Sequence, residues 1–231
     1  LYLRSLYYLL TLLYLTDDAG QYHKYLQQLN QYVEEVEEQL NPNSQHVRFV
    51  YQNLSKLNYF FLNKNFEQAH LFSEQVYAQL GEHRDLMDDH RILLFHYKFA
   101  AAAFAHGKYE LALERLHPIL YQGDKLLRKD MDINARLLEL LCLYETSALD
   151  RMSYRLISFG RSVVKTQQAT SLQLSTHKML RALLQLYPED SQSFLQQKLL
   201  TFREKAAQPR EQMFLKYLDI IAWMEKRIRK S

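Results

Sequence analysis

Apolar residues recur every three or four positions along most of the chain, which is the period of an α-helix. Between residues 21 and 40 the opposite side carries Glu34, Glu35, Glu37 and Glu38, so this helix is expected to have one buried and one solvated face. No segment shows a sustained two-residue alternation, and the sequence contains no Asn-Gly or Asp-Gly hairpin turn. The pattern predicts an all-α protein.

Breaks in this pattern divide the chain into antiparallel helical hairpins. We expect them at about residues 1–40, 44–80, 86–122, 130–165 and 171–206, followed by a C-terminal capping helix over 209–230, all in a single domain, 1–231. Gly81 and Gly107 are expected to end helices, whereas Pro188 and Pro209 are expected to lie at helix starts. Pro118 falls inside a helical pattern and is expected to kink that helix or to remove its last turn.

The stretch Leu94–Leu116 is the clearest of the predicted hairpins. Its first helix is rich in alanine between Ala100 and Ala105, and small side chains let two helix backbones approach closely. We therefore expect a tight helix crossing in this stretch. The next turn along the chain is expected at Gly123-Asp124.

The starts of the second helices of the predicted hairpins recur at a regular spacing. Aligned positions are Tyr22, Phe66, Tyr109 and Ser153, which are spaced 44, 43 and 44 residues apart, and Phe194 follows 41 residues later. Near-equal spacing in a helical chain is typical of a repeat array. Such an array buries each hairpin against its neighbours and leaves an extended face for partners.

Two segments of the chain resemble the core of a tetratricopeptide repeat: FLNKNFEQAHLF at 61–72 and FAHGKYELALERL at 104–116. Gly107, Tyr109 and Ala112 match the small residue, aromatic residue and alanine of that motif, and Phe66 and Ala69 match its last two positions. The period of 43–44 residues is longer than the 34 residues usual in the family. The resemblance implies a right-handed α–α superhelix of degenerate repeats.

The same resemblance implies a binding groove lined by the first helix of each hairpin. Among its groove positions, Tyr51, Asn58, Tyr97 and Glu145 are our candidates for contact with a partner, because they are polar or amphipathic. The remaining implied groove positions are Leu54, Phe61, Leu94, Ala101, Leu138 and Leu141.

Composition and charge exclude several classes of function. A net charge of +3 is too small to indicate a nucleic-acid-binding protein, and no apolar run reaches the roughly 20 residues of a membrane span. A single cysteine, Cys142, excludes an intramolecular disulfide and favours a reducing compartment, so we expect a cytoplasmic protein. The chain begins in a helical pattern without Met, and we expect it to be the C-terminal part of a longer protein.

No catalytic or metal-binding motif is present in the sequence, so we expect neither an enzyme nor a cofactor. The acidic and histidine-containing stretch from His83 to His90 is best explained by acidic residues at a helix N-terminus. Cys142 lies in a strongly apolar helix and is expected to be a buried thiol. The least favoured alternative is an active site assembled from His96, Cys142 and Glu145.

The sequence therefore predicts a non-enzymatic scaffold that binds a protein or peptide. The alternative is a structural or sensing domain of a larger bacterial regulator with an upstream effector domain. The aromatic residues of the first helix, from Tyr2 to Tyr14, are expected to pack on a preceding repeat or on another copy of the chain.

Overall fold

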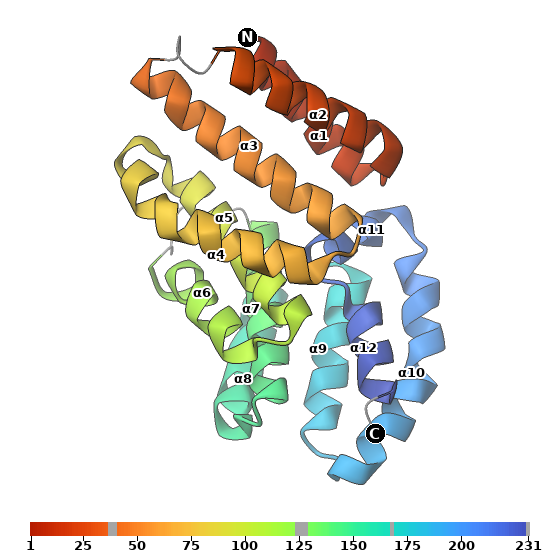
Figure 1. Ribbon diagram of the computed structural model, residues 1–231. Coiled ribbons are helices and arrows are strands. Elements are labelled where there is room, and N and C mark those ends of the chain that lie inside the picture. Colours follow the sequence, from red (N-terminus) through yellow and green to blue (C-terminus); the bar gives the residue numbers. More distant parts are fainter. Residues whose placement is uncertain (37–40, 123–128, 167–168, 230–231) are drawn as a thin grey trace. The chain divides into compact units, whose positions relative to one another are not determined.

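The structure of this protein is a computed structural model (Figure 1). All secondary-structure elements in the described part of the chain are helices. The structure describes residues 1–36, 41–122, 129–166 and 169–229, and no strand occurs among them. The prediction of an all-α protein is confirmed. No helix within these described ranges combines the length and the apolar character that a bilayer span requires.

The chain divides into two compact units, Leu1–Lys108 and Tyr109–Ser231, which we call unit 1 and unit 2. The boundary falls inside the predicted hairpin at 86–122, so the tight crossing expected between its two helices stays a prediction. The helices of unit 1 are α1 (Tyr2–Leu15), α2 (Ala19–Val36), α3 (Pro42–Leu62), α4 (Phe66–His83), the short 3-10 helix η2 (Arg84–Leu86) and α5 (Asp89–His106). The helices of unit 2 are α6 (Tyr109–Gln122), α7 (Lys129–Glu145), α8 (Leu149–Thr166), α9 (Ser171–Leu183), the 3-10 helix η3 (Pro188–Asp190), α10 (Ser191–Ala206), α11 (Pro209–Tyr217) and α12 (Ile220–Arg229).

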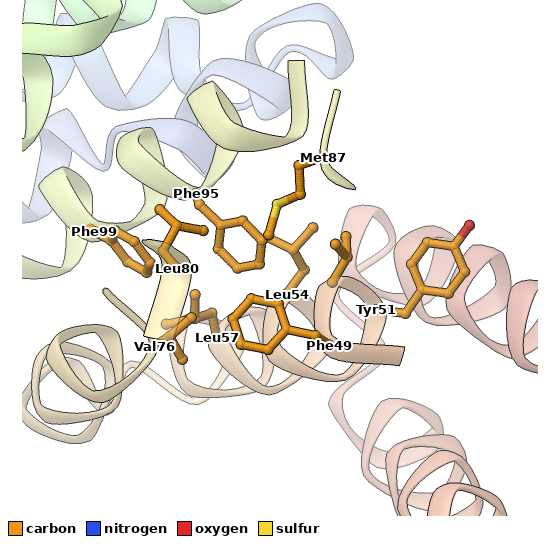
Figure 2. Packing of buried hydrophobic residues seen from close by; sticks show 10 residues of the cluster. Phe49, Tyr51, Leu54, Leu57, Val76, Leu80, Met87, Phe95 and Phe99 are labelled. Carbon is orange, nitrogen blue, oxygen red and sulfur yellow. The ribbon is translucent and has the colours of Figure 1, made fainter. Parts of the chain in front are cut away.

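Unit 1 is built on two hydrophobic clusters. The first joins α1 to α2 and comprises Leu6, Leu10, Tyr14, Tyr22, Leu26, Leu29 and Val33. The second joins α3, α4 and the start of α5, and Figure 2 shows the side chains of Phe49, Leu57, Val76 and Phe95 converging in it. The members of each cluster recur at helical spacing, because only one face of each helix can meet its neighbours.

Polar contacts connect these clusters within unit 1. The Tyr22 hydroxyl on α2 donates a hydrogen bond of 2.7 Å to the carbonyl oxygen of Ser55 on α3. The buried Lys98 ammonium on α5 lies 4.6 Å from the ring centroid of Tyr14 and 5.2 Å from that of Phe61. Aromatic faces stabilise a cation that is removed from water. These contacts fix α1, α2 and α5 around α3.

Helix α7 is the central element of unit 2. Its residues between Met131 and Leu143 are buried on nearly every side, and α7 packs against α6, α8 and α9. Its buried polar side chains are satisfied by neighbouring helices. The Asn134 carbonyl oxygen accepts a hydrogen bond of 2.7 Å from Gln173 on α9, and the Glu139 carboxylate accepts one of 2.9 Å from the Tyr121 hydroxyl on α6. Arg155 on α8 also lies 3.2 Å from Glu139.

Several predicted helix ends need correction. The end predicted at Gly81 is wrong, because α4 continues to His83, and Pro118 lies within α6 without ending it. Pro188 begins the short helix η3, and α10 starts only at Ser191. The predicted turn at Gly123-Asp124, the end of the first hairpin at 37–40 and residues 230–231 of the capping helix lie outside the described residues.

The predicted capping helix over 209–230 is interrupted. Pro209 begins α11 as expected, but Leu218 adopts an extended backbone that ends it. The Asp219 side chain then accepts a hydrogen bond of 2.9 Å from the Ala222 amide near the start of α12. Leu218 and Ile220, which lie at the break, are both buried. Packing of apolar side chains therefore outweighs the helical pattern at this point.

Candidate functional site: a groove between α8 and α9

The candidate groove residues that belong to unit 1 are buried. The exposed fractions of Tyr51, Asn58 and Tyr97 are 3%, 9% and 1%. Tyr51 on α3 stacks on Tyr7 of α1, with 4.1 Å between the ring centroids. A side chain enclosed in this way offers almost no surface to a partner. Burial therefore argues against direct contact of these residues with a ligand.

Glu145, the candidate in unit 2, is engaged by the C-terminal helix. Its carboxylate accepts a hydrogen bond of 2.8 Å from the Trp223 indole, and the Arg227 guanidinium lies 3.5 Å away. Tyr144 adds an edge contact to Trp223, with 5.9 Å between the ring centroids. Glu145 thus links the end of α7 to α12 and has no free carboxylate oxygen directed to a ligand.

The alternative active site receives no support from the surroundings of Cys142. Its thiol is fully buried on α7, and burial raises the pKa of Cys142 well above its usual value. Reactive cysteines have lowered pKa values, since the thiolate is the nucleophile. His96 belongs to unit 1, whereas Cys142 and Glu145 belong to unit 2.

The stretch from His83 to His90 is also structural in unit 1. The His83 ring stacks on Phe49 with 3.9 Å between centroids, and the Asp88 carboxylate accepts a hydrogen bond of 2.8 Å from the Arg91 amide at the start of α5. No group of three or more potential metal ligands occurs in the part of the chain that the structure describes.

A hollow of about 900 Å³ opens between α8 and α9 of unit 2. We call it the α8–α9 groove. One stripe of α8 lines it from Leu149 to Arg161, and the opposite wall comes from the C-terminal half of α9 and the residues just after it. The lining residues are Leu149, Asp150, Ser153, Leu156, Ile157, Gly160, Arg161, His177, Arg181, Leu184 and Gln185.

Contacts with the rest of unit 2 hold the two walls in place. Helix α8 packs against α7, and its buried residues include Met152, Leu156, Phe159 and Val163, of which Leu156 also lines the groove. The buried Glu211 carboxylate on α11 accepts hydrogen bonds of 2.9 and 3.1 Å from the first two backbone amides of α9. A carboxylate at this position satisfies unpaired amides and complements the helix dipole.

The two walls meet at Gly160 and His177. The His177 Nε2 atom lies 3.1 Å from the carbonyl oxygen of Leu156, and its ring packs beside Phe159. A Cβ atom added at Gly160 would lie 3.4 Å from the His177 ring, so the absence of a side chain leaves room between the walls. This contact forms the closed side of the groove.

The open side of the groove combines apolar and basic side chains. Ile157 is 56% exposed and Leu149 is 46% exposed, which is high for large aliphatic residues on a helix that also has a buried apolar stripe. Arg161 on α8 and Arg181 on α9 are exposed, and neither forms an ion pair with a described residue. Burial lowers the pKa of His177, and the nearby Arg181 and Lys178 lower it further. The lining of the groove therefore presents both exposed apolar surface and cationic side chains.

Sequence reasoning did not identify this groove. The available signal was that α8 carries apolar residues outside its core stripe, at Leu149 and Ile157. Such residues stand out only after the buried stripe is known, because a sequence pattern does not show which face of a helix its neighbours cover. No protein-family model, curated protein or solved structure matches this chain.

Proposed function

We propose that this chain is a helical scaffold that binds a segment of another protein, without catalysing a reaction, and that the α8–α9 groove is its binding site. The observation that carries the proposal is the hollow of about 900 Å³ with exposed Ile157 and Leu149 on its rim. Exposed aliphatic side chains beside a concave surface are typical of protein-binding sites.

The site proposed here differs from the groove that the tetratricopeptide resemblance implies. In that resemblance the first helices of the hairpins carry the ligand, whereas the α8–α9 groove joins the second helix of the predicted fourth hairpin to the first helix of the fifth. The burial of Tyr51, Asn58 and Tyr97 supports the change of site. The right-handed repeat array remains part of the proposal as the scaffold that presents the groove.

Selection of peptides on the purified protein tests this function. A displayed library of random 16-residue peptides would be selected on the wild-type chain and then measured on two tryptophan variants. Ser153→Trp fills the groove from α8 without a change in charge, whereas Ser193→Trp places the same side chain on the exposed face of α10. Both serines are exposed, so both variants are expected to fold.

Groove-dependent peptides should bind the wild-type chain and Ser193→Trp equally and lose at least about tenfold in affinity for Ser153→Trp, which corresponds to about 1.4 kcal/mol. Circular dichroism of the two variants checks that the helices are retained. A selection in which every peptide binds both variants equally would exclude the groove as the binding site.

A further inference from the structure

We infer that the partner segment is acidic and amphipathic, with apolar side chains that contact Leu149 and Ile157 and carboxylates that contact Arg161 and Arg181. This inference rests on the proposed function and adds the chemistry of the partner. The groove itself provides three observations: its length, its exposed apolar surface and two arginines that form no ion pair with a described residue.

The length of the groove suits a short helical or extended segment. Twelve residues separate Leu149 from Arg161 on α8, which corresponds to about 18 Å at 1.5 Å per residue. A partner helix of about three turns would cover this distance. It would bury Ile157 and Leu149, and the removal of their apolar surface from water would favour binding.

Some arginines elsewhere in unit 2 form ion pairs, whereas Arg151 and Arg210 have no carboxylate oxygen within 4 Å among the described residues. Arg136, Arg155, Arg203 and Arg227 each lie within 4 Å of a carboxylate oxygen: Asp132, Glu139, Glu225 and Glu145, respectively. Arg161 and Arg181 have no such neighbour among the described residues. Asp150 is the acidic residue of the lining, and it lies at the start of α8, eleven residues before Arg161.

Guanidinium groups without a carboxylate partner among the described residues lie on both walls and favour an anionic occupant. Arg161 extends from α8 and Arg181 from α9, and Lys178 lies beside His177 on the same helix. Guanidinium groups bind carboxylates through paired N–H donors. A segment with acidic residues on both sides of an apolar stripe would satisfy both walls at once.

A protein segment fits this surface better than a nucleic acid does. The lining contains two arginines, one on each helix, together with Leu149, Leu156 and other uncharged side chains. Binding to a phosphate backbone requires several adjacent cations, and the whole chain carries a net charge of only +3. The observations therefore favour carboxylates displayed on an apolar scaffold.

The peptide selection described above can test the chemistry directly. Peptides that lose affinity for Ser153→Trp should be enriched in Asp and Glu relative to the starting library. A selected peptide would be synthesised with its acidic residues intact, with each replaced by the neutral amide, and with each replaced by Lys. Affinities for the full chain would be measured by fluorescence anisotropy at 0.15 M salt.

Charge reversal provides the matched comparison. Arg161→Glu combined with Arg181→Glu should weaken binding of the acidic peptide at least about tenfold and should improve binding of the Lys peptide. Lys198→Glu combined with Arg210→Glu makes the same change in net charge at exposed positions of α10 and α11 and should have little effect. The reversal of preference separates a direct contact from a loss of folding.

The results separate failure of the acidic-partner inference from failure of the proposed function. Groove-dependent peptides without acidic enrichment, or with equal affinity for the two charge-reversal variants, would overturn the acidic partner and leave the proposed function intact. A selection without any groove-dependent peptide would overturn both. Arginine-dependent binding of single-stranded RNA, with no acidic peptide bound, would also contradict the inference.

Discussion

At the scale of single residues, the polar groups inside this protein serve the fold. Tyr22 donates to the carbonyl oxygen of Ser55, Glu211 accepts from the start of α9, and Glu145 accepts from Trp223. Each is buried, and a buried polar group without its partner costs free energy. These side chains therefore join helices, which explains why polar residues in the first half of a predicted hairpin need not mark a binding face.

Cys142 should react slowly with thiol reagents in the native protein. It is fully buried, and its pKa is raised by burial and by the nearby carboxylates of Glu139, Glu145 and Glu110. Alkylation by iodoacetamide at pH 8, followed by intact mass spectrometry, should be at least about 100-fold slower in buffer than in 6 M urea, because labelling requires opening of α7. Equal rates in the two solutions would contradict the burial of this thiol.

At the scale of helices, glycine positions distinguish a helix interior from a helix end. Gly81 lies inside α4, and apart from the adjacent residues and the nearby backbone of α4 no atom lies within 4 Å of the position that a Cβ would occupy there. Gly107 ends α5 with a φ of 89°, a left-handed conformation that other residues adopt at a cost. The two glycines occupy similar places in the sequence pattern but have opposite structural roles.

Alanine at these two positions should therefore change stability in opposite directions. Gly81→Ala should increase the free energy of unfolding by about 0.5–1 kcal/mol, because alanine favours a helix interior. Gly107→Ala should decrease it by about 1–2 kcal/mol, because alanine is strained in the left-handed conformation. Urea unfolding followed by circular dichroism measures both changes.

The free energies of unfolding of both variants would be compared with those of the wild-type protein and of Gly20→Ala. Gly20 also lies in a helix, and the nearest atom to its added Cβ is the Asp18 Oδ1 atom at 3.9 Å. Stabilisation by Gly107→Ala, or destabilisation by Gly81→Ala, would show that the helix boundaries at these positions are wrong.

At the scale of the whole molecule, histidines couple stability to pH in both units. Burial lowers the pKa values of His46 and His83 in unit 1 and of His177 in unit 2. His46 is the most enclosed, and neither ring nitrogen has a hydrogen-bond partner among the described residues. His83 and Arg91 lower the pKa of His46 further, while Asp88 raises it.

Stability should fall as the pH decreases below the ordinary histidine pKa of about 6.5. In that range the histidines of the unfolded chain bind protons that those of the folded chain bind only at lower pH, so acid favours unfolding. Above about pH 7.5 the three histidines are neutral in both states and have no effect on stability. The urea midpoint should therefore decrease between pH 7 and pH 5 and should stay constant between pH 7.5 and pH 8.

His46→Phe should reduce this decrease, because it keeps a ring in the buried site and removes the titrating group. His23→Gln, at an exposed position of α2, serves as the comparison and should retain the wild-type dependence. A midpoint that rises toward pH 5 in the wild-type protein would contradict the lowered histidine pKa values.

The helical class and several local features follow from the amino-acid sequence alone. The period of 3.6 residues predicted the helices, and the left-handed Gly107 and the start of α11 at Pro209 followed from the backbone preferences of those residues. The sequence also indicated that Cys142 would be buried. These features depend on residues close together in the chain.

Which helix faces are covered, in contrast, depends on the tertiary structure. It buried Tyr51, Asn58 and Tyr97, continued α4 beyond Gly81 and broke the last helix at Leu218. It also left Ile157 exposed beside Arg161 and Arg181. A periodic pattern defines the apolar faces of a helix, but the burial of each face depends on neighbours that are distant in the sequence.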